Sequence, residues 1–188
     1  RHDLSELKKN KKQISKLSSE VDNLKDKLFY FIKNLDESSL GASNFYINLL
    51  GYLQDITQSI EYISKVSHKH INNNHSKLTL NQIRDLLDIQ KVVFEVFEII
   101  NSAFSNKSFG DIKSILKDRN KTVGILEDKI EAQISRTRTS EEKSPKNAAL
   151  YFSILQESKD LMKEVMNLIE EYYVSYDKSV KPAKPKDE

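Results

Sequence analysis

Three histidines that lie close together in the sequence, His68, His70 and His75, are the side chains most suited to binding a metal ion. His68 and His75 are seven residues apart and would share one face of a helix, whereas His70 would point elsewhere. No His-Glu-x-x-His motif is present, and no carboxylate lies three or four residues from any of the three. We therefore expect them to be solvated and to cap the end of a helix rather than to form a metal site.

Asp55 and Ser59, four residues apart, form a second polar group beside an apolar stripe. A comparable group of acidic, amide and hydroxyl side chains occurs in a later helical stretch: Gln156, Glu157, Ser158 and Asp160. Two helices that brought these oxygens together could hold a divalent cation, which prefers oxygen ligands. The simpler interpretation is that Asp55 and Ser59 form hydrogen bonds across a helix interface and that most of the other groups are solvated.

The sequence contains no pattern that indicates an enzyme. It has no nucleophile–base motif, no glycine-rich phosphate loop and no defensible pair of catalytic carboxylates. The absence of cysteine excludes disulfides, thiolate zinc sites and a cysteine nucleophile. The net charge of +2 and the lack of a basic face that carries aromatic residues argue against nucleic-acid binding. We predict a protein that is not an enzyme, with no cofactor beyond a possible divalent metal ion and no nucleic-acid partner.

Three arginines have informative positions. Arg119 lies in an apolar stripe between Leu116 and Val123, so it requires a partner carboxylate or an exit to solvent, and we expect an ion pair. Arg136 and Arg138 lie beside a lysine-containing loop. They predict contact with anionic lipid headgroups or with another domain, or simply a solvated helix end.

Helices must position all of these groups, because apolar residues recur every three or four positions along most of the chain. The predicted helices span about 3–35, 44–74, 80–105, 109–138 and 146–176, and residues 177–188 are predicted to be a disordered tail. The first helix has a heptad pattern with Asn10 at one seam position, and we expect its N-terminal end to project into solvent. In the third helix the expected buried set is Ile83, Leu87, Val93, Phe94, Phe97, Ile100 and Phe104.

Two local features concern the second and third helices. Thr79 and Gln82 have the spacing of a capping box, in which each side chain accepts a hydrogen bond from the backbone of the other residue. Gly51 lies inside the second helix, where it costs about 1 kcal/mol relative to alanine. The close approach of a neighbouring helix would explain its presence.

The composition predicts one all-α domain over residues 1–176, an up-and-down antiparallel bundle of about five long helices. Charged residues make up 31% of the chain, and only 4 glycines are present, which disfavours α/β folds with their glycine-dependent turns. No apolar run approaches the ~20 residues of a membrane span. The start of the chain, which has helical character and lacks methionine, suggests a piece of a longer protein.

The stretch GYLQDITQSIEYISKVSHKHINNNHSKLTLNQIRDL resembles a segment of PhoU-like helical domains. It is most similar to the C-terminal region appended to inorganic phosphate transporters of the PiT type in Bacteroidetes-like bacteria. The stretch NAALYFSILQESKDLM fits this resemblance in order and length. The resemblance implies a PhoU-like, cytoplasmic regulatory or structural domain at the bacterial inner membrane. Its partners would be the transmembrane permease domain of the same chain and possible further copies, and it would act by helix–helix docking.

PhoU proteins bind metal ions through a repeated Glu-Arg-x-x-Asp signature that follows Tyr-Leu. Here Gln54 and Gln58 replace the two acids around Asp55, and Gln156 replaces the first acid before Asp160. The resemblance therefore implies at most a weak metal site at Asp55 and Asp160, because neutral ligands offset cation dehydration poorly. The alternative to a transporter domain is a free-standing helical adaptor or coiled-coil scaffold that dimerises through the first helix.

Overall fold

The computed structural model describes residues 3–106, 110–139, 141 and 143–177. This part of the chain forms six α-helices and one 3-10 helix and contains no β-strand, so the predicted all-α class is confirmed. The elements are α1 (Leu4–Lys33), η1 (Glu37–Ala42), α2 (Ser43–Asn72), α3 (Leu80–Asn106), α4 (Gly110–Lys117), α5 (Arg119–Arg138) and α6 (Pro145–Asp177). None of the helices in these residues combines the length and apolarity needed to cross a membrane.

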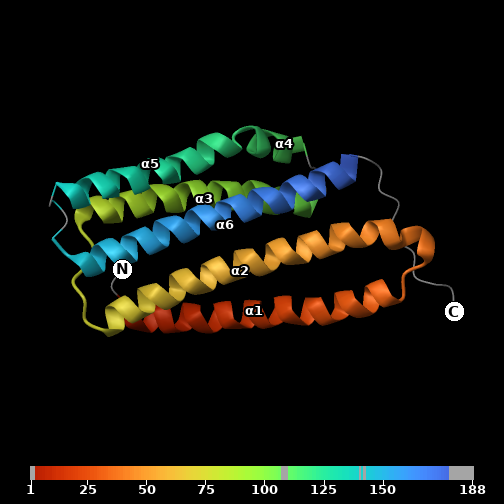
Figure 1. Cartoon of the computed structure of the whole chain (residues 1–188), viewed down its shortest axis with the longest axis horizontal. Helices are drawn as coiled ribbons and strands as arrows, with labels where there is room; N and C mark the ends of the chain where they lie inside the picture. Colours follow the sequence, from red (N-terminus) through yellow and green to blue (C-terminus); the bar gives the residue numbers. More distant parts are fainter. Residues whose placement is uncertain (1–2, 107–109, 140, 142, 178–188) are drawn as a thin grey trace.

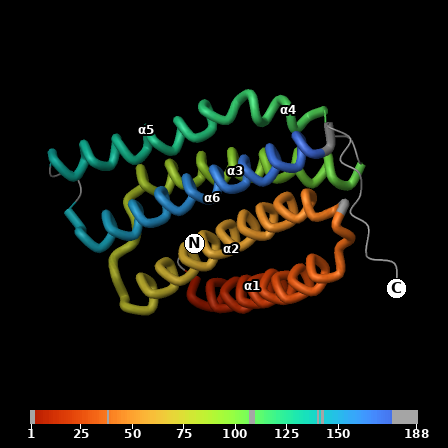
Figure 2. The backbone as a smooth tube through the Cα atoms, turned by 45° about the vertical axis from the view of Figure 1, so that its right-hand side comes forward, coloured from red at the N-terminus to blue at the C-terminus, as the bar shows by residue number. Residues whose placement is uncertain are grey.

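The long helices alternate in direction, as Figures 1 and 2 show, and form an antiparallel bundle. α6 is the central helix and packs most extensively against α2 and then against α5. α1 packs against α2 at one edge of the bundle, and α5 lies at the opposite edge. α3 is held by α4, α5 and α6.

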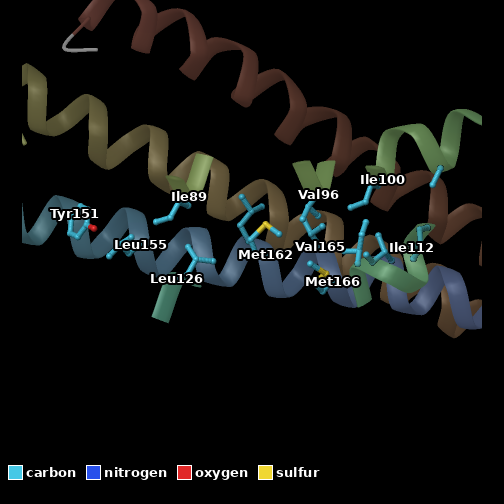
Figure 3. Close-up of a cluster of buried hydrophobic side chains, with 14 residues drawn as sticks. Ile89, Val96, Ile100, Ile112, Leu126, Tyr151, Leu155, Met162, Val165 and Met166 are labelled. Atoms are coloured by element: carbon cyan, nitrogen blue, oxygen red, sulfur yellow. The ribbon is translucent and has the colours of Figure 1, made fainter. Parts of the chain in front are cut away.

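The hydrophobic core lies where α6 meets α3, α4 and α5. Tyr151, Leu155, Met162 and Met166 of α6 have no exposed surface, and Figure 3 shows them along the same cluster as Ile89 and Val96 of α3. α6 also contributes Leu161, Val165 and Ile169, so it supplies half of the residues of this core cluster. The apolar period of α6 therefore organises the bundle, because a helix that is apolar over much of its circumference needs neighbours on several sides.

α2 and α6 can approach closely because they bury small side chains at the same height. Phe45 packs against Tyr172, which sets the register of the antiparallel pair. Ser59 lies fourteen residues after Phe45, Ser158 lies fourteen residues before Tyr172, and each is 7% exposed. Small residues at equal height shorten the distance between two helix axes.

Four sequence predictions about the helices can be compared with the structure. The capping box is confirmed: the Thr79 N–H donates to Gln82 Oε1 at 3.0 Å, and the Gln82 N–H donates to Thr79 Oγ1 at 3.3 Å. The explanation offered for Gly51 is wrong, because a Cβ there would meet nothing within 4 Å. The start of α1 does not project away, since Leu7 lines a pocket with Ile71 of α2. α6 continues to Asp177, and residues 178–188 lie outside the described residues.

The predicted fourth helix over 109–138 is in fact two helices, α4 and α5, and residue 109 lies outside the described residues. The break is at Asp118, where the backbone adopts φ −90° and ψ 7°. Its N–H is shared between the carbonyl oxygens of Ser114 and Ile115, both at 3.1 Å. The apolar stripe continues across this break, which is why periodicity alone indicated one helix.

Candidate functional site

The most extensive polar cluster among the described residues was not predicted, and it is centred on Asp85 of α3. One carboxylate oxygen, Oδ1, accepts a hydrogen bond from Lys129 Nζ at 2.6 Å. The other, Oδ2, accepts from Arg136 Nη2 at 3.1 Å and from the Tyr151 hydroxyl at 2.8 Å. These side chains come from α3, α5 and α6, so the cluster joins the three helices at one point.

Two buried glutamines extend this cluster. Gln82 and Gln133 are both 0% exposed, and Gln133 Oε1 accepts hydrogen bonds from Gln82 Nε2 at 3.5 Å and Arg136 Nε at 3.0 Å. The two donors settle the orientation of the Gln133 amide, because the opposite orientation would place donor against donor. The guanidinium of Arg136 also lies 5.6 Å from the centre of the Tyr151 ring. The cluster is thus a geometrically specific connection between helices.

The electrostatics of the cluster follow from this geometry. Partial burial would by itself raise the pKa of Asp85, but hydrogen bonds from Lys129, Tyr151 and Arg136 outweigh it and hold the pKa below its usual range. The hydrogen bond to Asp85 raises the pKa of Lys129. Burial, followed by the hydrogen bond to Asp85, raises the pKa of Tyr151. At neutral pH the cluster therefore consists of a carboxylate, two cations and a neutral phenol, all engaged with one another.

The arginine predictions had different outcomes. The ion pair expected for Arg119 is confirmed: Nη1 lies 2.9 Å from Glu170 Oε2, and Nη2 donates to Asn167 Oδ1 at 2.6 Å. Arg136 is neither solvated nor available to another domain, because it belongs to the Asp85 cluster. Arg138 is exposed and lines a shallow pocket with Glu131 and Thr139 at the end of α5.

The histidines are arranged differently from the expectation. His70 is 6% exposed, and its Nε2 lies 2.9 Å from the Ser76 carbonyl oxygen, so it ties the α2–α3 connection to the helix instead of being solvated. His75 packs against His70 with ring centres 5.0 Å apart. No group of three or more His, Cys, Asp or Glu side chains in the described part of the chain is arranged to hold a metal ion.

The two carboxylates implied as metal ligands have ordinary surroundings. Asp55 is exposed, and the carboxylate of Asp160 accepts hydrogen bonds from Gln156 Nε2 at 3.2 and 3.0 Å. The Gln156 amide therefore engages both carboxylate oxygens of Asp160. Ser59 is buried, as expected for a helix interface, whereas Asp55, expected beside it, is exposed. Ser158 belongs to a group expected to be mostly solvated, yet it is buried as well. A metal at Asp55 and Asp160 stays a prediction.

An open apolar groove lies between α1 and α2. It has a volume of about 320 Å³ and is lined by Leu24, Lys27, Leu28 and Phe31 of α1 and by Tyr46, Leu49, Leu50 and Leu53 of α2. Leu24 is 45% exposed, so part of its side chain is uncovered. Lys27 is the only charged residue of the lining, and it has no ion-pair partner among the residues the structure describes. We call this the α1–α2 groove.

Comparison of the chain with protein-family models, with curated proteins and with solved structures found no match in any of the three.

Proposed function

We propose that this chain is a cytoplasmic regulatory or structural domain of an inorganic phosphate transporter. In this proposal it acts by docking a helix of the transporter's membrane domain in the α1–α2 groove, and it catalyses no reaction. The proposal goes beyond the bundle fold and rests on two supports. The first is the resemblance of residues 51–86 to the domain appended to such transporters. The second, which carries the docking mechanism, is the open α1–α2 groove.

The groove has the chemistry that an amphipathic helix requires. Its apolar side chains recur every three or four residues on both helices, so they form ridges between which the side chains of a third helix can pack. Lys27 at the rim favours an occupant with an acidic residue beside its apolar face.

The remaining polar groups support a non-catalytic role. Asp85, Lys129, Arg136 and Tyr151 are engaged with each other between helices, and Arg119 is paired with Glu170. A catalytic carboxylate or lysine needs access to substrate. The arrangement instead uses the strongest polar contacts to position helices.

The test is a photo-crosslinking experiment in the transporter gene expressed in cells. A photoreactive phenylalanine analogue at Leu24 should crosslink to a membrane-spanning segment of the transporter, and Leu24→Glu should reduce phosphate uptake several-fold. Tyr30 provides the matched control, because it lies on the same helix, is 63% exposed and is outside the groove. The analogue at Tyr30 and the Tyr30→Glu variant should give neither effect.

Three outcomes would overturn the proposal. Phosphate uptake could be the same in Leu24→Glu and wild type, or the Leu24 crosslinks could go to a protein that is not a transporter. The third is a gene that encodes no membrane spans next to this chain, in which case the free-standing adaptor replaces the transporter domain.

A further inference from the structure

A pocket lies at the end of the bundle where α1, α3 and α6 begin and α2 ends (Figure 1). Its volume is about 370 Å³, within the range of roughly 300–1,000 Å³ that is usual for small-molecule sites. Most of its lining is apolar and comes from four helices. The apolar residues include Leu7 of α1, Ile71 of α2, Ile83 and Leu86 of α3, and Ile154 of α6. We call this the α2–α3 pocket.

The apolar lining continues outward along α3. Leu80 lies three residues before Ile83 and Leu87 four residues after it, so the three share one face of the helix. Leu80, Ile83 and Leu87 are 74%, 40% and 57% exposed. Large apolar residues that stay exposed side by side are characteristic of a binding surface. The surface of α3 can therefore cover part of a ligand that extends beyond the pocket.

Three polar residues line the same pocket, and they differ in what they can bind. Lys77, in the connection between α2 and α3, is exposed, and its ammonium group has no hydrogen bond or ion pair with the residues that the structure describes. His70 is already engaged, because the Ser76 carbonyl oxygen can only accept, so Nε2 carries a proton and donates it. Ser67 supplies a hydroxyl. Lys77 is thus the group of the lining that is free to bind an anion.

We propose that the α2–α3 pocket binds a small amphipathic anion, a medium-chain alkyl carboxylate, with its alkyl chain among the apolar residues and its carboxylate on Lys77. The alkyl chain gains free energy when it leaves water for the apolar lining. A lysine ammonium is a compact charge on a flexible stem, which suits a carboxylate that stays partly in water. An inorganic anion would leave the apolar lining uncovered, and a neutral alkane would leave Lys77 unused.

Binding should also connect α1 more firmly to the bundle. α1 packs mainly against α2, and Leu7 brings its first turn to a pocket whose other walls belong to α2, α3 and α6. An alkyl chain in the pocket would contact all four helices. Local opening of the start of α1 should then become rarer, so backbone amide hydrogen exchange around Leu7 should slow when the ligand is added.

Isothermal titration calorimetry of the 188-residue chain with decanoate, below its micelle concentration, tests the proposal. Wild type should bind decanoate, and Lys77→Gln should weaken this binding by about two- to fivefold, as the loss of an exposed ion pair does. Decanol is the matched ligand, because it has the same chain without the charge, and it should bind wild type and Lys77→Gln equally. Lys65→Gln is the control variant: Lys65 is an exposed lysine of α2 outside the pocket, and its substitution should leave decanoate binding unchanged.

A second pair of variants tests the apolar lining. Ile83→Asp places a carboxylate in the pocket and should weaken decanoate binding by about tenfold or more. Ile99→Asp is the matched control, because Ile99 lies on the same helix, outside the pocket, and is 39% exposed against 40% for Ile83. It should bind decanoate like wild type. Both residues are partly exposed, so both variants should keep the circular dichroism spectrum of wild type.

A lipid in a bilayer offers the same chemistry as a free carboxylate, and flotation with vesicles of phosphatidylglycerol distinguishes the two sources. For a free carboxylate we expect binding of decanoate in solution and no flotation of the chain with the vesicles. Flotation that Ile83→Asp abolishes, without binding of decanoate, would replace the free carboxylate by a membrane lipid.

Three further results would overturn the proposal. They are a wild-type chain that does not bind decanoate, equal weakening by Ile83→Asp and Ile99→Asp, and a Lys77→Gln variant that weakens decanoate and decanol equally or weakens neither. The α2–α3 pocket shares no lining residue with the α1–α2 groove. Because the titration uses the isolated chain, its failure and that of the proposed function are separate.

Discussion

The two outer helices of the bundle, α1 and α5, are attached in opposite ways. α5 contacts α3 and α6 through the Asp85 cluster, in which Asp85, Lys129 and Arg136 have side chains only 14%, 26% and 19% exposed. α1 is ten residues longer than α5, since the helices have 30 and 20 residues, yet only Val21 is buried in it. Its apolar flank is partly uncovered, since Leu17 and Leu24 are 41% and 45% exposed.

This difference shows what each kind of contact can do. Hydrogen bonds to a charged group depend on distance and direction, so the Asp85 cluster selects one position of α5 along and around its neighbours. Apolar contact depends mainly on area, so α1 can pack against α2 and still present a flank to a third helix. The region around the Asp85 cluster is closed. The open groove lies beside α1, which contacts α2 mainly through apolar side chains, with an exposed 3.5 Å hydrogen bond from Ser18 to Glu61.

Among the substitutions that test this difference, removal of the Asp85 carboxylate should cause the largest loss of stability. Asp85→Ala leaves Arg136 partly buried without its counter-charge and leaves Lys129 with only the exposed Asp88 as a partner, and we expect a loss of about 2–4 kcal/mol in the free energy of unfolding. Urea denaturation of the two proteins measures this. Asp88→Ala is the control, because Asp88 also pairs with Lys129 but has a side chain that is 66% exposed, and it should cost about 0.5 kcal/mol or less. Equal losses in both variants would show that the cluster has no special role.

Low pH should also destabilise the protein through Asp85, by protonating its carboxylate. The pKa of Asp85 is lower in the folded protein than in the unfolded chain, so its contribution is complete above the unfolded value of about 3.9 and is lost as the pH falls through the folded value. Stability should therefore fall below about pH 4. Asp85→Asn should show a shallower fall than Asp88→Asn when both are followed by urea midpoints. If the urea midpoints of the two variants fell equally with pH, the loss of stability in acid would not come from Asp85.

Tyr151→Phe should have a smaller effect, because it removes one hydrogen bond and leaves the ion pairs intact. We expect a loss of about 1 kcal/mol near neutral pH. The raised pKa of Tyr151 means that its contribution is present below the unfolded value of about 10 and is lost as the pH rises through the folded value. Ultraviolet titration of the folded protein should show an ionisation of Tyr151 with a raised pKa, and this step should be absent from Tyr151→Phe.

In α1, the substitution Leu24→Glu should change the free energy of unfolding much less than Asp85→Ala does. Leu24→Glu changes a residue that is 45% exposed, and glutamate is a good helix former, so we expect a change within about 0.5–1 kcal/mol. Thermal unfolding measures this. A loss comparable to that of Asp85→Ala would mean that Leu24 belongs to the core and that the groove is not open.

The sequence alone determined the helices and the class of the fold. Spacings of three and four residues located α1, α2, α3 and α6 to within about two residues. The capping box at Thr79 and Gln82 and the ion pair of Arg119 were also predictable, because each depends on a local rule: a side chain near a helix start, or a charge within an apolar stripe.

Only the tertiary structure decided which face of each helix is covered. In α3 the expected burial is confirmed for Val93, Phe97 and Ile100, which pack in or against the core. It is wrong for Leu87 and Phe94, which are exposed, while the face with Gln82 and Asp85 is turned inward. That choice depends on Lys129, Arg136 and Tyr151, which are more than forty residues away and satisfy the polar groups that face them. Helix periodicity depends on neighbours in sequence, whereas the burial of a carboxylate depends on partners that are neighbours only in space.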